Sequence, residues 1–138
     1  MPLVRISVRR DVPIATRRAI SKAIQQAMVE TINVPPDDRF HIFSEHDADG
    51  LLYDPGYLGI SRDGGFLTIQ ITLALGRSVA QKKALYRRIA DLVSEHGVRQ
   101  ENVFISLLEV AKENWSFGNG KAQYADAPPA HLVAPAVV

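Results

Sequence analysis

Residues 3–8, Leu-Val-Arg-Ile-Ser-Val, and residues 67–73, Leu-Thr-Ile-Gln-Ile-Thr-Leu, decide the fold. In both stretches apolar residues occupy every second position, which is the pattern of a strand with one buried face. A shift of 65 positions takes Val4 onto Ile69, and the neighbouring apolar positions follow. The two stretches therefore predict two strands in equivalent places of a duplicated unit.

Each of these strands is followed by a segment with helical periodicity. Apolar residues recur about every four positions over residues 14–32 and again after Ser78, with polar residues mostly on the other faces. Pro13 suits the first turn of the first helix. Ser78 with Gln81 has the form of a capping box, and Gly97 stands where a helix terminator belongs.

A second strand completes each half, at residues 39–45 and 103–110. Two β-α-β halves, about 2–46 and 66–110, would pair their strands into one four-stranded sheet with both helices on one face. This predicts an α+β fold. The other face of the sheet needs a cover, and a subunit partner is the simplest one.

The composition bounds the function. A chain of 138 residues with 46% apolar and 22% charged residues is typical of one globular domain. The net charge of +1 gives no reason to expect a nucleic-acid partner, and no segment resembles a signal peptide or a membrane span. The absence of cysteine excludes thiolate chemistry, and the four histidines show no metal-ligand spacing. We therefore expect a cytoplasmic protein with neither a membrane partner nor a metal site.

The end of the chain is less regular. Residues 111–125 contain three aromatic residues, Trp115, Phe117 and Tyr124, around a glycine-rich turn. We place a single domain at residues 1–125. Residues 126–138 are mostly Ala, Pro and Val, and we expect a tail that is flexible or packed against a partner.

Pro2 is the first candidate for chemistry. Removal of Met1 would leave a secondary amine at the start of a strand, and burial in an apolar pocket would lower the pKa of that amine into the range of a general base. If Met1 is retained, no free proline amine exists and the hypothesis fails. The alternative is that Met-Pro is simply a common way for a protein to begin.

Several motifs, taken in order, resemble those of the tautomerase superfamily, and within it the malonate semialdehyde decarboxylase-like group. The motifs are Pro2-Leu3-Val4 opening a strand, Val34-Pro35 followed by Asp38-Arg39, Arg77-Ser78 leading into the second helix, and Trp115-Ser116-Phe117-Gly118 near the end. The resemblance runs from residue 2 to about residue 125. It implies a homotrimer that needs no cofactor and uses the amino-terminal proline as catalytic acid or base on a small oxo acid.

The resemblance also implies roles for particular residues. Asp38 would orient the proline or a water, and Arg77 would hold the substrate carboxylate. The three aromatic residues would form a wall for an aryl or alkyl substituent. Without the resemblance, Asp38 reads more readily as a turn residue or strand-entry cap, and the aromatic residues as core or interface packing. Arg77 is then equally well a solvated arginine ahead of a helix.

One position departs from the decarboxylase pattern, which ends the third strand with two arginines two residues apart. This chain has Leu75 at the first position and keeps only the second, as Arg77. Keto–enol tautomerisation of a 2-oxo acid needs fewer groups, so we favour a tautomerase. The alternative is a decarboxylase or hydratase of a 3-oxo acid such as malonate semialdehyde, and a more remote one is a non-catalytic ferredoxin-like binding module.

Overall fold

Two antiparallel strands, β1 (Pro2–Arg9) and β3 (Leu67–Ala74), form the centre of a four-stranded sheet. The outer strands, β2 (His41–His46) and β4 (Val103–Val110), run parallel to their neighbours, so that the strand order is β2-β1-β3-β4. The computed structural model describes residues 1–128. Both β-α-β halves of the sequence therefore contribute two adjacent strands to one sheet.

The register at the centre of the sheet shows the duplication directly. Val4 lies opposite Ile71, and Ile6 lies opposite Ile69. The shift of 65 positions takes Val4 to Ile69 and Ile6 to Ile71, and so it exchanges these two pairs. The halves are thus related by an approximate twofold axis that passes between β1 and β3.

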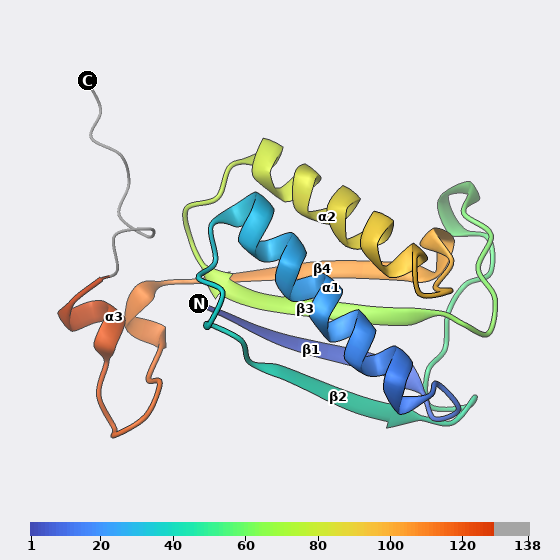
Figure 1. The fold of residues 1–138 in the computed structure, drawn as a ribbon, viewed down its shortest axis with the longest axis horizontal. Helices are drawn as coiled ribbons and strands as arrows, with labels where there is room; N and C mark the ends of the chain where they lie inside the picture. The colour runs from blue at the N-terminus through green and yellow to red at the C-terminus, as the bar shows by residue number, and fades with distance from the viewer. Residues whose placement is uncertain (129–138) are drawn as a thin grey trace.

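Two long helices, α1 (Ile14–Ile32) and α2 (Val79–Ser94), cover one face of the sheet side by side (Figure 1). Pro13 directly precedes α1, whose end is marked by Asn33 in the left-handed conformation with φ of 60°. The predicted capping box at the start of α2 is present. The Gln81 backbone N–H donates to Ser78 Oγ at 3.1 Å, and the Ser78 N–H donates to Gln81 Oε1 at 2.9 Å.

The two faces of the sheet differ in what they contact. Val4, Ile6, Ile69 and Ile71 are fully buried beneath the helices, where burial of apolar area supplies most of the favourable free energy of folding. On the other face, apolar side chains are 40–51% exposed in the single chain. They are Phe40, Ile42, Phe104 and Leu108.

The predicted α+β architecture is confirmed, with both helices on one face. Strand β2 begins at His41, two residues later than predicted, although the carbonyl of Phe40 still accepts a hydrogen bond from Val4 N at 3.0 Å. A short helix, α3 (Gln123–Asp126), reaches into the predicted tail, and residues 129–138 of that tail lie outside the described residues. Within residues 1–128, none of the helices is long and apolar enough to cross a membrane.

Candidate active site

The amino terminus lies at the end of the sheet, and Pro2 is its first residue in β1. Proline is tolerated there because the first residue of a strand can dispense with a ladder donor. Pro2 is buried, and Met1 ahead of it is only 8% exposed. The Met1 α-amino group lies 3.5 Å from Oδ2 of Asp38. Burial lowers the pKa of this amine, with Arg77 acting in the same direction and Asp38 in the opposite one.

Asp38 is positioned by a tight turn and by a buried side chain of α1. The Asp38 backbone N–H donates to the carbonyl of Pro35 at 3.0 Å. Gln25, which is 7% exposed, donates from Nε2 to the carbonyl of Asp38 at 3.1 Å and to that of Pro35 at 3.4 Å. The carboxylate is therefore carried on backbone that is fixed from two sides, with its side chain only 12% exposed beside the chain terminus.

Arg77 reaches the same place from the loop between β3 and α2. Its Nε and Nη2 donate to the carbonyl of Ile32 at 3.4 and 3.2 Å, and its Nη1 donates to the carbonyl of Ala74 at 3.2 Å. Ile32 ends α1, so this carbonyl has no partner within the helix. Three of the five guanidinium N–H groups are thus directed at the described backbone, which leaves two for a ligand.

The charges of these groups act on one another. Burial lowers the pKa of the Arg77 guanidinium, whereas Tyr124, Glu109 and Asp38 act to raise it. Burial and the negative charge of Asp38 raise the pKa of the Tyr124 phenol, and Arg77 opposes them. The amino terminus, Asp38, Arg77 and Tyr124 consequently lie close enough to influence one another's protonation.

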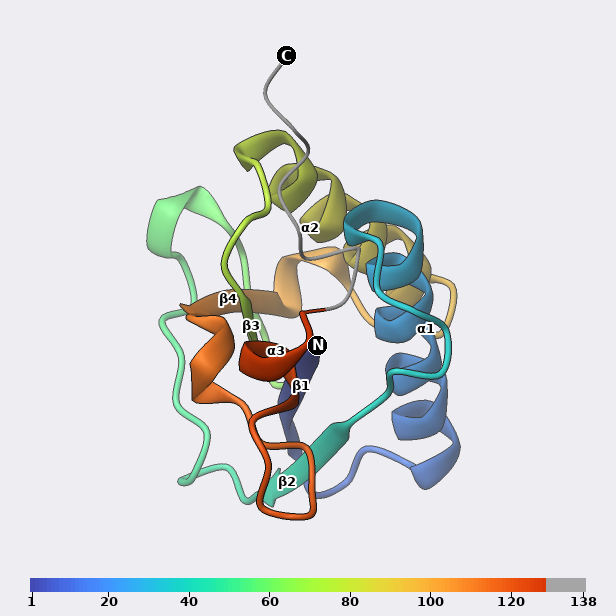
Figure 2. The ribbon, with the colours of Figure 1, turned by 90° about the vertical axis from the view of Figure 1, so that its left-hand side faces the viewer.

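The three predicted wall residues also come together. Trp115 stacks on Phe117 with ring centroids 5.6 Å apart, and Tyr124 meets Phe117 edge to face at 4.5 Å. Gln123 holds this segment in shape, because its Oε1 accepts from Phe117 N at 3.0 Å and its Nε2 donates to the carbonyl of Gly118 at 2.8 Å. Figure 2 shows α3 beside the amino terminus of the same chain. Tyr124 of this cluster lies close enough to Asp38 and Arg77 for their charges to act on its phenol.

Three residues around this site, Gln25, Glu109 and Lys82, were not predicted from the sequence. Gln25 lies within the helix predicted at residues 14–32, where a polar residue carries no signal for a site. Glu109 lies near Arg77 and forms an ion pair with Lys82, which is on the first turns of α2. Glu109 lies near the end of β4, which pairs with β3, and β3 leads into the loop that carries Arg77. This position was the one signal for Glu109. Leu75, by contrast, is 55% exposed and adds no charge to the site.

The groups that the fold brings together are an amine, a carboxylate and a guanidinium. Within residues 1–128, no group of three or more histidine or acidic side chains could hold a metal ion. A buried amine, a carboxylate and a guanidinium beside an aromatic wall can exchange a proton with a small anionic substrate.

Two family models, both described as tautomerase enzyme, match the chain over residues 38–118 and 2–59. The chain belongs to the tautomerase family. The chain is 44% identical over 124 residues to the probable tautomerase YusQ of Bacillus subtilis (strain 168), a match that covers 89% of this chain and 98% of the relative. The predicted family is thereby confirmed.

The solved structures that resemble this chain include malonate semialdehyde decarboxylase, the group that the sequence predicts. FG41 malonate semialdehyde decarboxylase inhibited by 3-bromopropiolate superposes with a TM-score of 0.88 at 34% identity, covering 93% of this chain and 98% of that one. A fused 4-OT protein, a symmetric trimer, shares the fold with a TM-score of 0.75 at 24% identity over 91% of this chain and 98% of that one. The chain is therefore an enzyme, an isomerase or a related decarboxylase, and not a non-catalytic binding module.

Proposed function

We propose that this enzyme is a cofactor-independent tautomerase of a small 2-oxo acid or its enol, with Pro2 as the general acid and base. The observation that carries the proposal is the burial of the chain terminus between the Asp38 carboxylate and the Arg77 guanidinium. Asp38 assists the amine, Arg77 binds the substrate carboxylate, and Trp115 and the aromatic residues beside it receive the apolar substituent.

Removal of Met1 moves the terminal amine by one residue, about 3.8 Å along the chain. The new terminus is the secondary amine of Pro2, in a buried position at the start of β1. The causes that lower the pKa of the present terminus, burial and the nearby Arg77, apply to this amine as well, while Asp38 opposes them. A proline amine with a lowered pKa is suited to proton transfer near neutral pH.

The substrate would be held by its carboxylate. Arg77 has two N–H groups that the backbone does not use, and a guanidinium can bind a carboxylate with two parallel hydrogen bonds. Its anchoring to Ile32 and Ala74 fixes the direction of the guanidinium before substrate arrives. An aryl or alkyl group on the substrate would pack against the cluster of Trp115 and Phe117.

The proposed reaction moves one proton and leaves the enzyme unchanged. The neutral Pro2 amine accepts the proton of the enol hydroxyl, and the C=O bond forms as the C=C electron pair moves to C3. The resulting ammonium then gives a proton to C3, which restores the neutral amine. Asp38 stabilises the ammonium between the two steps, because an adjacent carboxylate favours the charged form of an amine.

The test is the rate of phenylenolpyruvate ketonisation by protein whose intact mass shows that Met1 is absent. We expect clear activity that Pro2→Ala reduces by about 100-fold or more, the usual range for a lost general base. Protein that retains Met1 should be inactive, since its Pro2 nitrogen is part of a peptide bond. Equal rates for wild type and Pro2→Ala would overturn the proline mechanism.

Decarboxylation of a 3-oxo acid such as malonate semialdehyde is the second candidate. Two observations support it: the 34% identity to FG41 malonate semialdehyde decarboxylase, and the carboxylate of Asp38, which favours a protonated amine able to polarise an oxo group. Leu75→Arg would restore the missing cation, and we expect it to raise kcat/KM for malonate semialdehyde about tenfold. The same change at Leu52, exposed in a distant loop, is the control. No gain from Leu75→Arg would count against this activity.

We also propose that the enzyme is a homotrimer. The apolar side chains on the uncovered face of the sheet support this assembly, because a partner would remove them from water. The fused 4-OT protein with the same fold is a trimer. Light scattering coupled to size exclusion should give three times the mass of one chain.

A further inference from the structure

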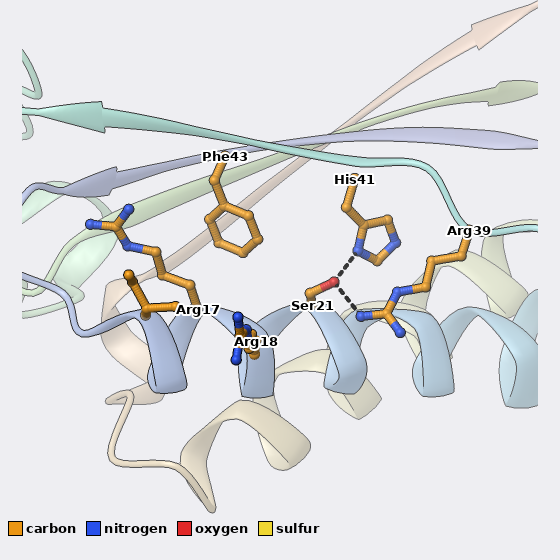
Figure 3. A pocket seen from close by; sticks show the side chains of 7 residues that line it. Arg17, Arg18, Ser21, Arg39, His41 and Phe43 are labelled. Carbon is orange, nitrogen blue, oxygen red and sulfur yellow. Dashed lines mark hydrogen bonds between the residues drawn. The ribbon is translucent and has the colours of Figure 1, made fainter.

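A second concave site lies away from the amino terminus, between the first half of α1 and the start of β2. It is a groove of ≈ 460 Å³, a volume within the usual range for small-molecule sites. The groove is on the helical side of the sheet, opposite the face that a trimer would cover. Ile14 and Phe43 provide its apolar surface, and polar side chains from both elements complete it (Figure 3).

Three arginines line the groove, and their charges are compensated unequally. Arg17 is paired with Glu45, with Nη1 and Oε1 2.5 Å apart, and its Nε and Nη2 each donate to a backbone carbonyl. Within residues 1–128, no carboxylate pairs with Arg18 or Arg39. Two uncompensated guanidinium groups therefore border one groove.

Arg39 is held in place by a buried hydroxyl. Its Nη2 donates to Ser21 Oγ at 2.8 Å, and Ser21 is only 6% exposed. Burial and the neighbouring Arg39 lower the pKa of His41 to about 4, so that the imidazole is neutral near pH 7. The Ser21 hydroxyl can then donate to His41 Nδ1, 2.7 Å away, while it accepts from Arg39. Figure 3 shows the three side chains joined in this order.

This arrangement fits an anion with an apolar body. One of the five N–H groups of Arg39 is used by Ser21, and a positioned guanidinium is well suited to carboxylate or phosphate oxygens. Phe43 projects from β2 toward α1 on the side of Arg17 and Arg18, with His41 between it and Arg39, and offers a flat apolar surface. Neither feature is needed for the chemistry at Pro2.

We propose that this groove is a second ligand site, which binds a small organic anion through Arg18 and Arg39 and packs the apolar body of that ligand against Phe43 and Ile14. The headgroup is a carboxylate or a phosphate. The proposal does not depend on the function proposed for Pro2, because the two sites share no residue.

The test is titration of the full-length protein with benzoate, phenyl phosphate, inorganic phosphate and benzyl alcohol. Binding is followed by NMR through the guanidinium Nε–H signals of the arginines and the ring signals of Phe43. We expect saturable shifts at Arg39 and Phe43 with benzoate or phenyl phosphate, and none with benzyl alcohol. Comparison of the first two probes distinguishes a carboxylate from a phosphate ligand.

Variants locate the binding. Arg39→Gln and Arg18→Gln should each weaken the affinity for the tighter-binding of benzoate and phenyl phosphate by about tenfold or more, since a charge-assisted pair is lost. Arg87→Gln, which removes an exposed arginine of α2, should leave the affinity unchanged. Arg77→Gln should also leave it unchanged, which separates the groove from the proposed active site.

Three results would overturn the proposal. They are the lack of any saturable shift at Phe43, unchanged affinity in both Arg39→Gln and Arg18→Gln, and inorganic phosphate binding as tightly as phenyl phosphate. Equal binding of inorganic phosphate and phenyl phosphate would mean that the apolar surface of the groove does not contribute to ligand binding. Arg18 is an exposed residue whose change should not disturb folding, so the Arg18→Gln result is interpretable even if Arg39→Gln is unstable.

Discussion

The side-chain amide of Gln25, buried in the middle of α1, donates a hydrogen bond at 3.1 Å to the backbone carbonyl of Asp38. A helix residue thus fixes the turn that presents the carboxylate to the chain terminus. The side chain of Gln25 itself does not need to touch the substrate for this purpose.

Gln25→Leu should therefore impair activity through Asp38. We expect the free energy of unfolding to fall by about 1–2 kcal/mol, because the carbonyl of Asp38 loses the Gln25 amide donor while that of Pro35 keeps only the Asp38 N–H. The rate of phenylenolpyruvate ketonisation at saturation should fall as well, and the pH dependence of kcat should shift as Asp38 moves relative to the amine. Gln26→Leu, at an exposed position of the same helix, is the matched control. A loss of stability with an unchanged pH profile would limit Gln25 to a structural role.

Arg77→Lys keeps the positive charge but removes the planar fork of N–H groups. We expect KM for an oxo-acid substrate to rise about tenfold or more, since one ammonium cannot replace both a bidentate contact and the anchors to Ile32 and Ala74. Steady-state kinetics check the effect, and Arg87→Lys on α2 is the control. An unchanged KM would show that the substrate carboxylate is bound elsewhere.

Leu108→Arg places a charge on the uncovered face of the sheet, where Leu108 is 50% exposed in the single chain. If this face is the interface of a trimer, the buried charge should dissociate it into smaller species. Light scattering on the variant should report the loss of the trimer, whereas Ile14→Arg, at an exposed position on the helical side of the sheet, should keep it. A trimeric Leu108→Arg protein would place the interface on another surface.

The lowered pKa of His41 predicts that the stability of the folded protein depends on pH. Its pKa in the folded protein is about 4, compared with an ordinary value of 6.5, because of burial and then of Arg39. Between these values the unfolded chain takes up a proton that the folded protein does not, so stability falls as the pH falls from 6.5 to 4.

Urea unfolding at pH 7 and pH 4.5 measures this contribution. We expect the loss of stability in wild type to exceed that in His41→Gln by about 1–2 kcal/mol, a value reduced for the partial exposure of the ring. His96→Gln, at an exposed position, should behave as wild type. Equal losses in wild type and His41→Gln would contradict a histidine that is neutral in the folded state.

Local signals were sufficient to predict most of the fold. The bounds of α1 follow from its apolar periodicity and from Pro13, and the start of α2 follows from Ser78 and Gln81, because helix ends depend on interactions within a few residues. The single four-stranded sheet followed from the repeat, whereas the pairing of β1 with β3 at its centre was not predicted. The helix ends depend on residues that are close together in the sequence, and the sheet is predicted because its pattern occurs twice.

The site was harder to predict because it depends on contacts between distant segments. The sequence could not show that Arg77 is anchored to Ile32, or that Gln25 reaches the backbone of Asp38. It could not place Tyr124 beside Arg77 either, since that requires the path of the loop after β4. The irregular segments at 33–40 and 111–125 bring these groups together, and no periodicity describes their course.

The twofold axis between β1 and β3 relates two ends of the sheet that differ in their chemistry. By the 65-residue repeat, Leu67 stands where Pro2 stands in the first half, at the opposite end of the sheet. Its nitrogen belongs to an internal peptide bond, so the second half has no terminal amine to offer. On the proposed mechanism, a chain built from two equivalent units therefore carries one reactive end, at Pro2, and none at the end of the sheet near Leu67.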